Sequence, residues 1–440
     1  MNGNKEHGTA VGSSRPDWRP GGRQIFRRLV SALGFKSSRS LRAAAGGAWA
    51  AAGWFLGAGA AQAQNTNAYL PFEGLCYSPF RTGENPNLPI YPTLSEINAD
   101  LTNIVKYLAP EIRTYGMSGT LSNIPALCCS NNLNCYPCAY ISLGYTTVNG
   151  AAICTALGAS TNEMNALIAV GNANYPTTKG LIVGNESILN TEDPNMVAAL
   201  IGCINQVRTN LNGNVKTPVT TAETWDDVYR WPTLVSNLDF IMIHVDPIWY
   251  GQAITNAVNY VLTQYEVITN AYPGKRVVVG ETGWPGGGTF SDPAEPGVAS
   301  LVNQTAFLLE LNARLKTNHL ECLVFEPFDE LWKDAANTND IEDNWGLYYA
   351  NRTMKPSLSN YLSQNLTLSL DTPPKARGVN VTIGTYAGNP YGLYESSNLA
   401  EGWTPNPPTH FTGAWGTNQT TLEVTNNGGN AWFFRAVQGF

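Results

Sequence analysis

The sequence predicts a (β/α)8 barrel, an α/β fold in which eight parallel strands alternate with helices, followed by a small all-β module. Three observations predict this class. Between residues 72 and 362, eight short apolar runs alternate with amphipathic stretches. Several of the runs are nearly continuous in Val, Ile and Leu, as strands buried on both faces must be. The 440 residues, 43% of them apolar, allow one large domain with its own core and one smaller piece.

The eight runs give the expected strands of the barrel. A doubly wound parallel sheet is the alternative, but its first strand usually leads into a Gly-rich phosphate-binding turn. The segment that follows the first run here, Cys76-Tyr77-Ser78-Pro79-Phe80-Arg81, is not such a turn. The barrel is therefore favoured. The strands are expected at residues 73–77, 111–115, 140–144, 181–184, 219–222, 240–244, 276–280 and 323–328.

Helical periodicity separates several of these runs. Apolar residues recur at spacings of three and four over 94–108, 196–207 and 302–315. Pro194, directly after Asp193, is typical of a capped helix start with proline in the first turn. We therefore expect helices in these three stretches.

The pattern changes after the last strand, and it divides the chain into expected domains. Residues 1–63 form a leader, 64–365 the barrel domain, 366–378 a linker around Thr372-Pro373-Pro374, and 379–440 the β module. The module has short alternating strands, no helix signal, and three tryptophans. It could bind carbohydrate or cell wall, although a structural cap or spacer is the favoured interpretation. The tryptophans are Trp403, Trp415 and Trp432.

The N-terminal segment has the composition of an export signal. Residues 1–42 contain nine Lys or Arg residues and two acidic residues, and an uncharged run rich in Ala and Gly spans 43–60. Ala61-Gln62-Ala63 is an A-x-A cleavage site, so we expect cleavage before Gln64 and an exported protein in the periplasm, at the cell surface or outside the cell. The alternative is an uncleaved segment that anchors the protein in a membrane, because about 20 apolar residues can span a bilayer.

Composition limits the class of partner. The formal charge is −7 although the leader is strongly basic, so the rest of the chain is acidic and has no basic stripe, which argues against nucleic acid. The 12 Trp and 20 Tyr suit a protein that handles sugars. The four His residues lack the spacing of metal ligands. We expect no metal, no other cofactor, and a monomer.

All eight cysteines follow the leader, and an even number in an exported chain suggests disulfides. Four of them lie within eleven residues, amid Ser, Asn and Pro, in an expected loop between strands two and three. We expect Cys128, Cys129, Cys135 and Cys138 to pair with one another or with a neighbouring loop. A zinc site is the alternative, but only Cys135 and Cys138 form a Cys-x-x-Cys pair and no His is near.

Two strand ends carry the residues best suited to chemistry. Leu181–Gly184 leads into Asn185 and Glu186, and Val277–Gly280 leads into Glu281. Carboxyl groups at the ends of barrel strands point into the mouth where active sites lie. One carboxylic acid and one carboxylate are what cleavage of a glycosidic bond requires. Ordinary salt bridges would explain one isolated Glu better than they explain two at matched strand ends.

The two strand ends resemble a known family. Gly184-Asn185-Glu186 and Gly280-Glu281-Thr282-Gly283-Trp284-Pro285 resemble the two signature segments of glycoside hydrolase family 17, the β-1,3-glucanases. The resemblance covers about residues 72–360, is greatest for bacterial and fungal members, and leaves the C-terminal module unexplained. The other segments that carry it are Cys76–Arg81, Ile112–Tyr115, Thr221–Trp225, His244–Trp249, Phe325–Lys333 and Glu342–Leu347.

The resemblance implies a retaining enzyme with Glu186 as general acid/base and Glu281 as nucleophile. It also implies supporting roles for Glu330, Lys333 and Glu342 near the nucleophile. A cation such as Lys333 beside Glu281 would keep that carboxylate ionised. Asn185 is placed to hydrogen-bond the 2-hydroxyl of the sugar. The other residues expected to support the site or contact the substrate are Tyr115, His244, Trp249, Tyr250, Trp284 and Trp332, although packing would explain each aromatic ring equally well.

Three functions stay open on this basis. The first is an exported endo-1,3-β-glucosidase of the laminarinase type that works by double displacement. The second is a transglycosidase that passes the glucosyl group to another sugar from the same site. The third, a glucan-binding protein without catalysis, requires the loss of one carboxyl group, and both are present. Pro327, Leu331 and Tyr145 depart from the usual family residues, so the subsites and the product length are not predicted.

Overall fold

The computed structural model describes residues 71–290, 297–318, 320–333 and 339–364, followed by the backbone of six strands between residues 368 and 438. The expected leader at residues 1–63 lies outside the described residues. So do the three tryptophans of the expected C-terminal module, Trp403, Trp415 and Trp432.

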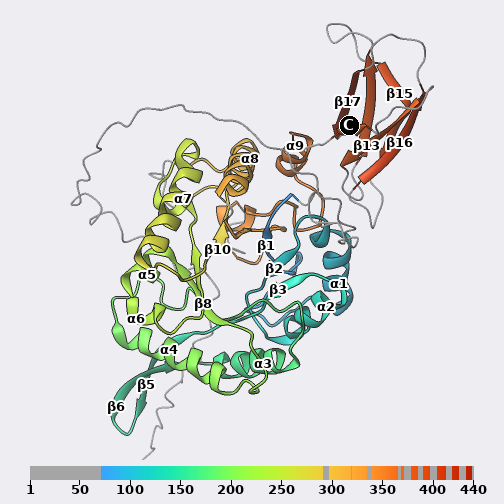
Figure 1. The fold of residues 1–440 in the computed structure, drawn as a ribbon. Coiled ribbons are helices and arrows are strands. Elements are labelled where there is room, and N and C mark those ends of the chain that lie inside the picture. Colours follow the sequence, from blue (N-terminus) through green and yellow to red (C-terminus); the bar gives the residue numbers. More distant parts are fainter. Residues whose placement is uncertain are drawn as a thin grey trace, which may run out of the picture. The chain divides into compact units, whose positions relative to one another are not determined.

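Nine short strands pair in parallel in one sheet that closes into a barrel (Figure 1). The order of the strands is β3-β2-β1-β11-β10-β9-β8-β7-β4. β3 pairs with β2, β4 pairs with β7, and Pro137 alone separates β3 from β4. These two segments act as one interrupted strand, so the barrel has eight strand positions, as expected. The bounds are β1 Gly74–Cys76, β2 Glu111–Arg113, β3 Asn134–Tyr136, β4 Cys138–Ala139, β7 Leu181–Asn185, β8 Val219–Thr224, β9 Ile241–His244, β10 Val277–Thr282 and β11 Cys322–Val324.

The interruption at Pro137 follows from the chemistry of proline. Its nitrogen carries no hydrogen and cannot donate to a neighbouring strand. Its carbonyl still accepts a hydrogen bond from the backbone N–H of Ile182 at 2.9 Å. The barrel therefore stays closed through this position although the ladder is broken there.

Helices follow the strands along the chain and cover the outside of the barrel (Figure 1). The expected start of one helix is confirmed, because α4 begins at Pro194 and the Asp193 side chain accepts a hydrogen bond from the Asn195 N–H. The helical bounds are α1 Leu94–Asn103, α2 Ile124–Ser130, α3 Ser160–Ala173, α4 Pro194–Thr209, α5 Trp225–Arg230, α6 Pro232–Val235, α7 Ile254–Ala271, α8 Leu301–Asn318 and α9 Pro356–Gln364. The 3-10 turns are η3 Val105–Tyr107, η4 Gly119–Asn123, η5 Pro247–Tyr250 and η6 Ile341–Asn344.

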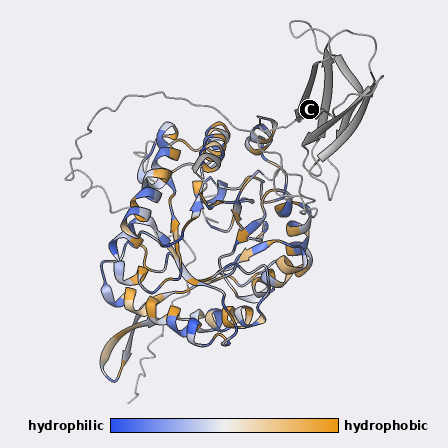
Figure 2. Cartoon of the chain, viewed as in Figure 1, coloured by the Kyte–Doolittle hydropathy of each residue, from blue (hydrophilic) through white to orange (hydrophobic). Residues whose placement is uncertain are grey.

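The core has an inner and an outer layer. Side chains from alternate strand positions fill the barrel, while the helices pack their apolar faces on its outside, so orange and blue alternate along the helices in Figure 2. Gly280 is required inside the barrel, because a Cβ there would collide with the Met242 side chain. The inner cluster comprises Cys76, Tyr136, Cys138, Ile182, Ala222, Phe240, Met242, Val278 and Leu323.

The expected third strand at residues 140–144 is wrong. The strand lies at residues 134–139, and the chain then leaves the barrel to form an antiparallel hairpin of β5 (Leu143–Val148) and β6 (Ala151–Ala156). Because residues 134–138 are rich in Cys, Asn and Pro rather than Val and Ile, periodicity gave no sign of a strand there. The other seven expected strands agree with the structure within a few residues.

The expected pairing of the cysteines stays a prediction, and the structure places Cys128 beside Cys135. All eight cysteines are free thiols in this structure. Cys128, on α2, and Cys135, on β3, lie in the outer core, whereas Cys138 lies inside the barrel. The segment is therefore buried barrel structure, not a polar loop, and Cys135 and Cys138 sit in different layers of the core and do not meet.

Beyond α9, the strands pair only in antiparallel fashion. Two three-stranded sheets have the orders β12-β13-β16 and β15-β14-β17. The division of the chain at a linker of residues 366–378 stays a prediction. The strand β12 lies within that range and pairs with β13. The bounds are β12 Leu368–Leu370, β13 Gly378–Gly384, β14 Pro390–Ser396, β15 Thr404–Thr412, β16 Gln419–Thr425 and β17 Phe433–Gln438. Among the described residues, no helix has the length and apolar character needed to cross a bilayer.

Candidate active site

Two carboxyl groups meet at the ends of two barrel strands. Glu186 directly follows β7, and Glu281 lies near the end of β10. The side chains of both are 10% exposed. One oxygen of each carboxyl group and one ring nitrogen of His244 lie within 4.8 Å of one another. The closed barrel therefore brings together two residues that are 95 positions apart in the sequence.

His244, at the end of β9, lies between the two carboxyl groups. Its Nδ1 is 3.1 Å from Glu186 Oε1, and its Nε2 is 3.3 Å from Glu281 Oε1. The side chain is fully buried. The β-ladder fixes its place, because His244 pairs with Glu281 across β9 and β10.

Arg113, at the end of β2, supplies the positive charge beneath this group. Its Nη1 donates to Glu281 Oε1 at 3.1 Å and to His244 Nε2 at 2.6 Å. Its Nη2 donates to Asn185 Oδ1. The guanidinium is fully buried and lies over the Tyr115 ring, 4.6 Å from the centroid. One side chain thus fixes residues from the ends of β7, β9 and β10.

This geometry assigns the tautomer of His244. A guanidinium has only N–H donors, so Nε2 of His244 must accept the hydrogen bond from Arg113. The imidazole is then neutral and carries its hydrogen on Nδ1, which donates to Glu186 Oε1. Glu186 and Glu281 consequently receive different partners, an imidazole N–H for Glu186 and a guanidinium for Glu281. Such different surroundings separate the roles of two carboxyl groups.

The same group of residues could be read as a metal site, because two carboxylates and one imidazole supply suitable donor atoms. Arg113 argues against this reading. Its guanidinium already contacts both Glu281 and the imidazole nitrogen that would have to bind the metal. A metal cation at this place would be repelled by the buried positive charge of Arg113. The three residues therefore do not fit a metal ion.

A second charged cluster lies after β11. Lys333 Nζ is 2.8 Å from Glu326 Oε1 and 2.9 Å from Glu330 Oε2. Glu330 Oε1 also accepts hydrogen bonds from the Ser78 hydroxyl and from Trp332 Nε1, the latter at 2.9 Å. Lys333 lies over the Phe325 ring, 4.3 Å from the centroid. All three charged residues of this cluster are buried.

Lys333 lies between two buried carboxyl groups whose pKa values are shifted in opposite directions. Burial, and then the neighbouring Glu330, raise the pKa of Glu326 well above its usual range. Burial also acts on Glu330, but Lys333 and the Ser78 hydroxyl bring the pKa of Glu330 below its usual value. Burial alone would lower the pKa of Lys333, yet Glu326, Glu330 and Glu342 raise it. Glu330 and Lys333 thus form the ion pair, and Glu326 favours its neutral form.

This cluster corrects one expectation. Lys333 was expected beside Glu281, but among the described residues its Nζ lies against the carboxyl groups of Glu326 and Glu330, and the cation that contacts Glu281 is Arg113. Glu342 acts on Lys333 through its charge, which agrees with its place near this cluster.

The structure separates the expected substrate-contacting aromatics into two groups. Trp284 is 1% exposed, packs on Phe307 of α8 and donates its Nε1 hydrogen to Val298 O, so the expectation that it stacks on a sugar is wrong here. The others are only partly buried. Tyr115 lies against Arg113, Trp249 against Phe290 and Trp345, Tyr250 donates to Asp226, and Trp332 lies edge-on to Phe80.

Arg113 and Glu326 were not singled out from the sequence. Arg113 gave one usable signal, because it is a charged residue inside the strand-like segment Glu111–Tyr115 and a buried charge requires a partner. Glu326 gave none, because whether a Glu near a strand end faces Lys333 depends on the fold of the loop that follows.

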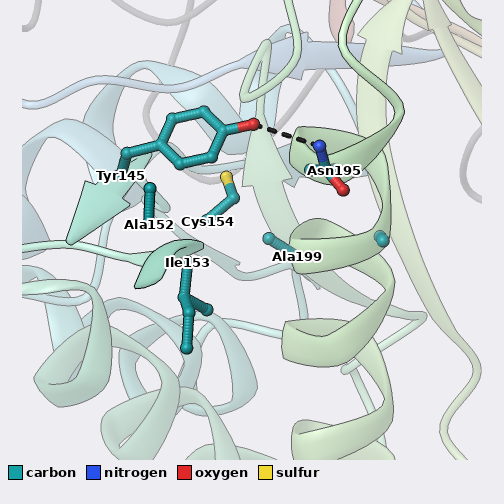
Figure 3. Close-up of a pocket in the computed structure, with 7 residues that line it drawn as sticks. Tyr145, Ala152, Ile153, Cys154, Asn195 and Ala199 are labelled. Carbon is teal, nitrogen blue, oxygen red and sulfur yellow. Dashed lines mark hydrogen bonds between the residues drawn. The ribbon is translucent and has the colours of Figure 1, made fainter. Parts of the chain in front are cut away.

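A separate hollow lies between the β5–β6 hairpin and α4 (Figure 3). Tyr145 and Asn195 face each other across it, and Asn195 Nδ2 donates to the Tyr145 hydroxyl at 3.2 Å. The remaining lining residues, Ala152, Ile153, Cys154, Ala198 and Ala199, are mostly apolar. None of the carboxyl groups described above lines this hollow.

Known proteins resemble this chain in sequence. Residues 74–346 match the model of the BtgE/BtgC glycoside hydrolase domain. A glucan endo-1,3-beta-glucosidase btgC of Aspergillus niger is 27% identical over 317 residues, which are 67% of this chain and 44% of that protein. The glucan 1,3-beta-glucosidase of Saccharomyces cerevisiae is 32% identical over 127 residues, 27% of this chain and 40% of that protein. The chain thus spans less than half the length of these relatives.

Solved structures show the same fold. A β-1,3-glucanosyltransferase of Rhizomucor miehei, assigned to glycoside hydrolase family 17, is 27% identical with a TM-score of 0.52, and the match covers 65% of this chain and 96% of that one. An active-site mutant of the Rhizomucor enzyme has been seen in complex with laminaritriose. An endo-laminarinase from Formosa, 17% identical with a TM-score of 0.55 over 67% of this chain and 87% of that one, shows the fold alone.

Removing Arg113 tests its place as the cation of the site. Arg113→Met leaves Glu281 buried without its partner, and we expect the free energy of unfolding to fall by about 3–5 kcal/mol. In a Glu281→Gln background the same substitution should cost less, with a coupling energy of about 0.5–3 kcal/mol in a double-mutant cycle measured by denaturant unfolding.

Arg276 and Glu321 provide the matched control, because they form an ion pair whose side chains are 40% and 47% exposed. Their cycle should give less than about 1 kcal/mol. A coupling of Arg113 and Glu281 no larger than that of the control pair would contradict the assignment.

Proposed function

The chain belongs to the BtgE/BtgC glycoside hydrolase family, and from this premise we propose that it cleaves β-1,3-glucan internally by double displacement. The observation that carries the proposal is the approach of Glu186 and Glu281, whose carboxyl oxygens lie within 4.8 Å. The two carboxyl groups of retaining enzymes lie about 5–5.5 Å apart, whereas those of inverting enzymes lie about 6.5–9.5 Å apart to admit a water molecule. The 4.8 Å limit refers to one oxygen of each carboxyl group, and this close approach supports a retaining pair. The names of the similar glucanases support β-1,3-glucan as the substrate.

Glu281 is the proposed nucleophile. Its carboxylate is held by Arg113, which keeps the negative charge in place, and it attacks the anomeric carbon as the glycosidic bond breaks. Glu186 donates its proton to the departing sugar oxygen in the same step. The product of this step is a glycosyl ester on Glu281.

Water completes the reaction. Glu186, now a carboxylate, removes a proton from a water molecule that attacks the anomeric carbon from the side of the departed sugar. The ester bond to Glu281 breaks, and the configuration of the substrate is retained. Neutral His244 donates its Nδ1 hydrogen to Glu186 at 3.1 Å, while Arg113 donates to both His244 and Glu281, so the two carboxyl groups are held in register through Arg113 and His244 together.

A transglycosidase is the second candidate, and one observation favours it. The similar Rhizomucor structure is named a β-1,3-glucanosyltransferase. In this case a sugar hydroxyl takes the place of water in the second step, and the residues of the first step are unchanged. Oligosaccharides longer than the laminari-oligosaccharide supplied would identify transfer, and shorter ones alone would identify hydrolysis.

The mechanism predicts opposite azide products from two variants. In Glu281→Ala, azide occupies the space of the lost nucleophile and gives an α-glycosyl azide from an activated β-glucosyl donor. In Glu186→Ala the glycosyl ester still forms when the leaving group needs no proton, and azide then gives the β-azide. Both variants should lose nearly all cleavage of glucan. The anomeric configuration of the azide, measured by NMR, distinguishes the two.

Swapped anomers would mean that the two roles are reversed. Full glucan cleavage by Glu281→Ala would remove the basis of the assignment, because among the described residues Glu281 is the carboxylate at the end of β10.

Export is part of the proposal, and the basic leader with its Ala61-Gln62-Ala63 site supports it. N-terminal sequencing of protein recovered from the periplasm or medium should begin at or near Gln64. Protein recovered only from membranes with residues 1–63 intact would instead support the anchor.

A further inference from the structure

The backbone at Glu186 has a conformation that requires support. Its φ is +49°, in the left-handed region that residues other than glycine rarely adopt. This conformation turns the chain sharply at the end of β7. It also sets the direction of the Glu186 side chain, so whatever holds the turn also positions the proposed acid/base.

The neighbouring strand β8 holds this turn at three points. The N–H of Glu186 donates to Ala222 O at 2.8 Å. The next two N–H groups donate to the Glu223 side chain, from Ser187 to Oε1 at 3.2 Å and from Ile188 to Oε2 at 3.3 Å. Three successive peptide groups, beginning at Glu186, are thus bound by two adjacent residues of one strand.

Glu223 is itself rigidly held. It is fully buried, and the Thr221 hydroxyl donates to its Oε1 at 3.0 Å. Both carboxyl oxygens therefore act as acceptors for the turn, and neither is turned toward solvent. A buried carboxyl group needs such donors, because its desolvation is otherwise unfavourable.

We propose that Glu223 is a positioning residue for the proposed acid/base: its two oxygens anchor the peptide groups after Glu186 and so aim the Glu186 carboxyl at the glycosidic oxygen. This inference rests on the proposed function. It explains why a fully buried carboxyl group stands on β8 without a basic side chain as its hydrogen-bond partner. It also assigns a role within the Thr221–Trp225 segment.

The leaving-group dependence of the first step tests this positioning. A phenyl β-laminaribioside needs a proton on its departing oxygen, whereas a 2,4-dinitrophenyl one does not. We measure kcat/KM for both, since it reports the first step. Glu223→Met removes both acceptors at similar volume. The phenyl substrate should then fall about 10²-fold, and the dinitrophenyl substrate less than threefold.

Glu163 gives the matched control. It is also buried, and its carboxyl group also accepts two backbone N–H groups, from Met117 and Tyr140, and one hydroxyl, from Ser118. Because it holds other loops, Glu163→Met should lower the melting temperature and leave the ratio of the two substrates unchanged.

Glu223→Asp keeps a carboxyl group but is too short to reach both N–H groups, so it serves if the Met variant does not fold. Its ratio of dinitrophenyl to phenyl kcat/KM should rise about tenfold. A ratio equal to that of the wild type in Glu223→Asp, or both substrates falling by the same factor in Glu223→Met, would overturn the inference.

Glu186→Ala separates this outcome from a failure of the proposed function. A changed ratio in Glu186→Ala with an unchanged ratio in both Glu223 variants rejects only the role of Glu223. A wild-type protein inactive on both substrates, or an unchanged ratio in Glu186→Ala, rejects the proposed function itself.

Discussion

The buried guanidinium of Arg113 is the interaction on which the arrangement of the two carboxyl groups depends. A charge removed from water must be paired, and Arg113 is paired at once with Glu281, His244 and Asn185. Because these partners come from the ends of β7, β9 and β10, one side chain on β2 links four positions around the barrel. Because Nε2 of His244 accepts from Arg113, the ring hydrogen lies on Nδ1 and is donated to Glu186, while Glu281 contacts the guanidinium.

The other buried charged residues near Arg113 have partners of their own. Lys333 neutralises Glu330, and Glu326 beside them favours its protonated form, so this cluster holds little net charge. Glu223 is satisfied by backbone N–H groups and one hydroxyl. Glu326, Glu330 and Glu223 thus each have buried partners of their own, apart from Glu186 and Glu281.

The barrel and the meeting of Glu186 with Glu281 could be predicted from the sequence because both depend on local patterns. Seven apolar runs became strands, and two of them lead directly to Glu186 and Glu281. The third strand was missed because residues 134–138 contain no Val, Ile or Leu and Pro137 interrupts them. The burial of Cys128 and Cys135 was missed with it. The partner of Glu281 could not be predicted, because the pairing of Arg113 with Glu281 depends on the folded positions of β2 and β10. The burial of the Trp284 side chain could not be predicted either, because it depends on packing against Phe307 of α8.

The account rests on Glu281 as the nucleophile that forms a covalent glycosyl ester. Trapping that ester tests the account most directly. A 2-deoxy-2-fluoro laminaribioside with a good leaving group slows both steps but lets the first proceed, so a retaining enzyme accumulates its glycosyl ester. Mass spectrometry of the digested protein should then find one glycosyl group, on the peptide that contains Glu281. A label on Glu186 or Glu330, or an active enzyme that inverts configuration and takes no label, would contradict the account.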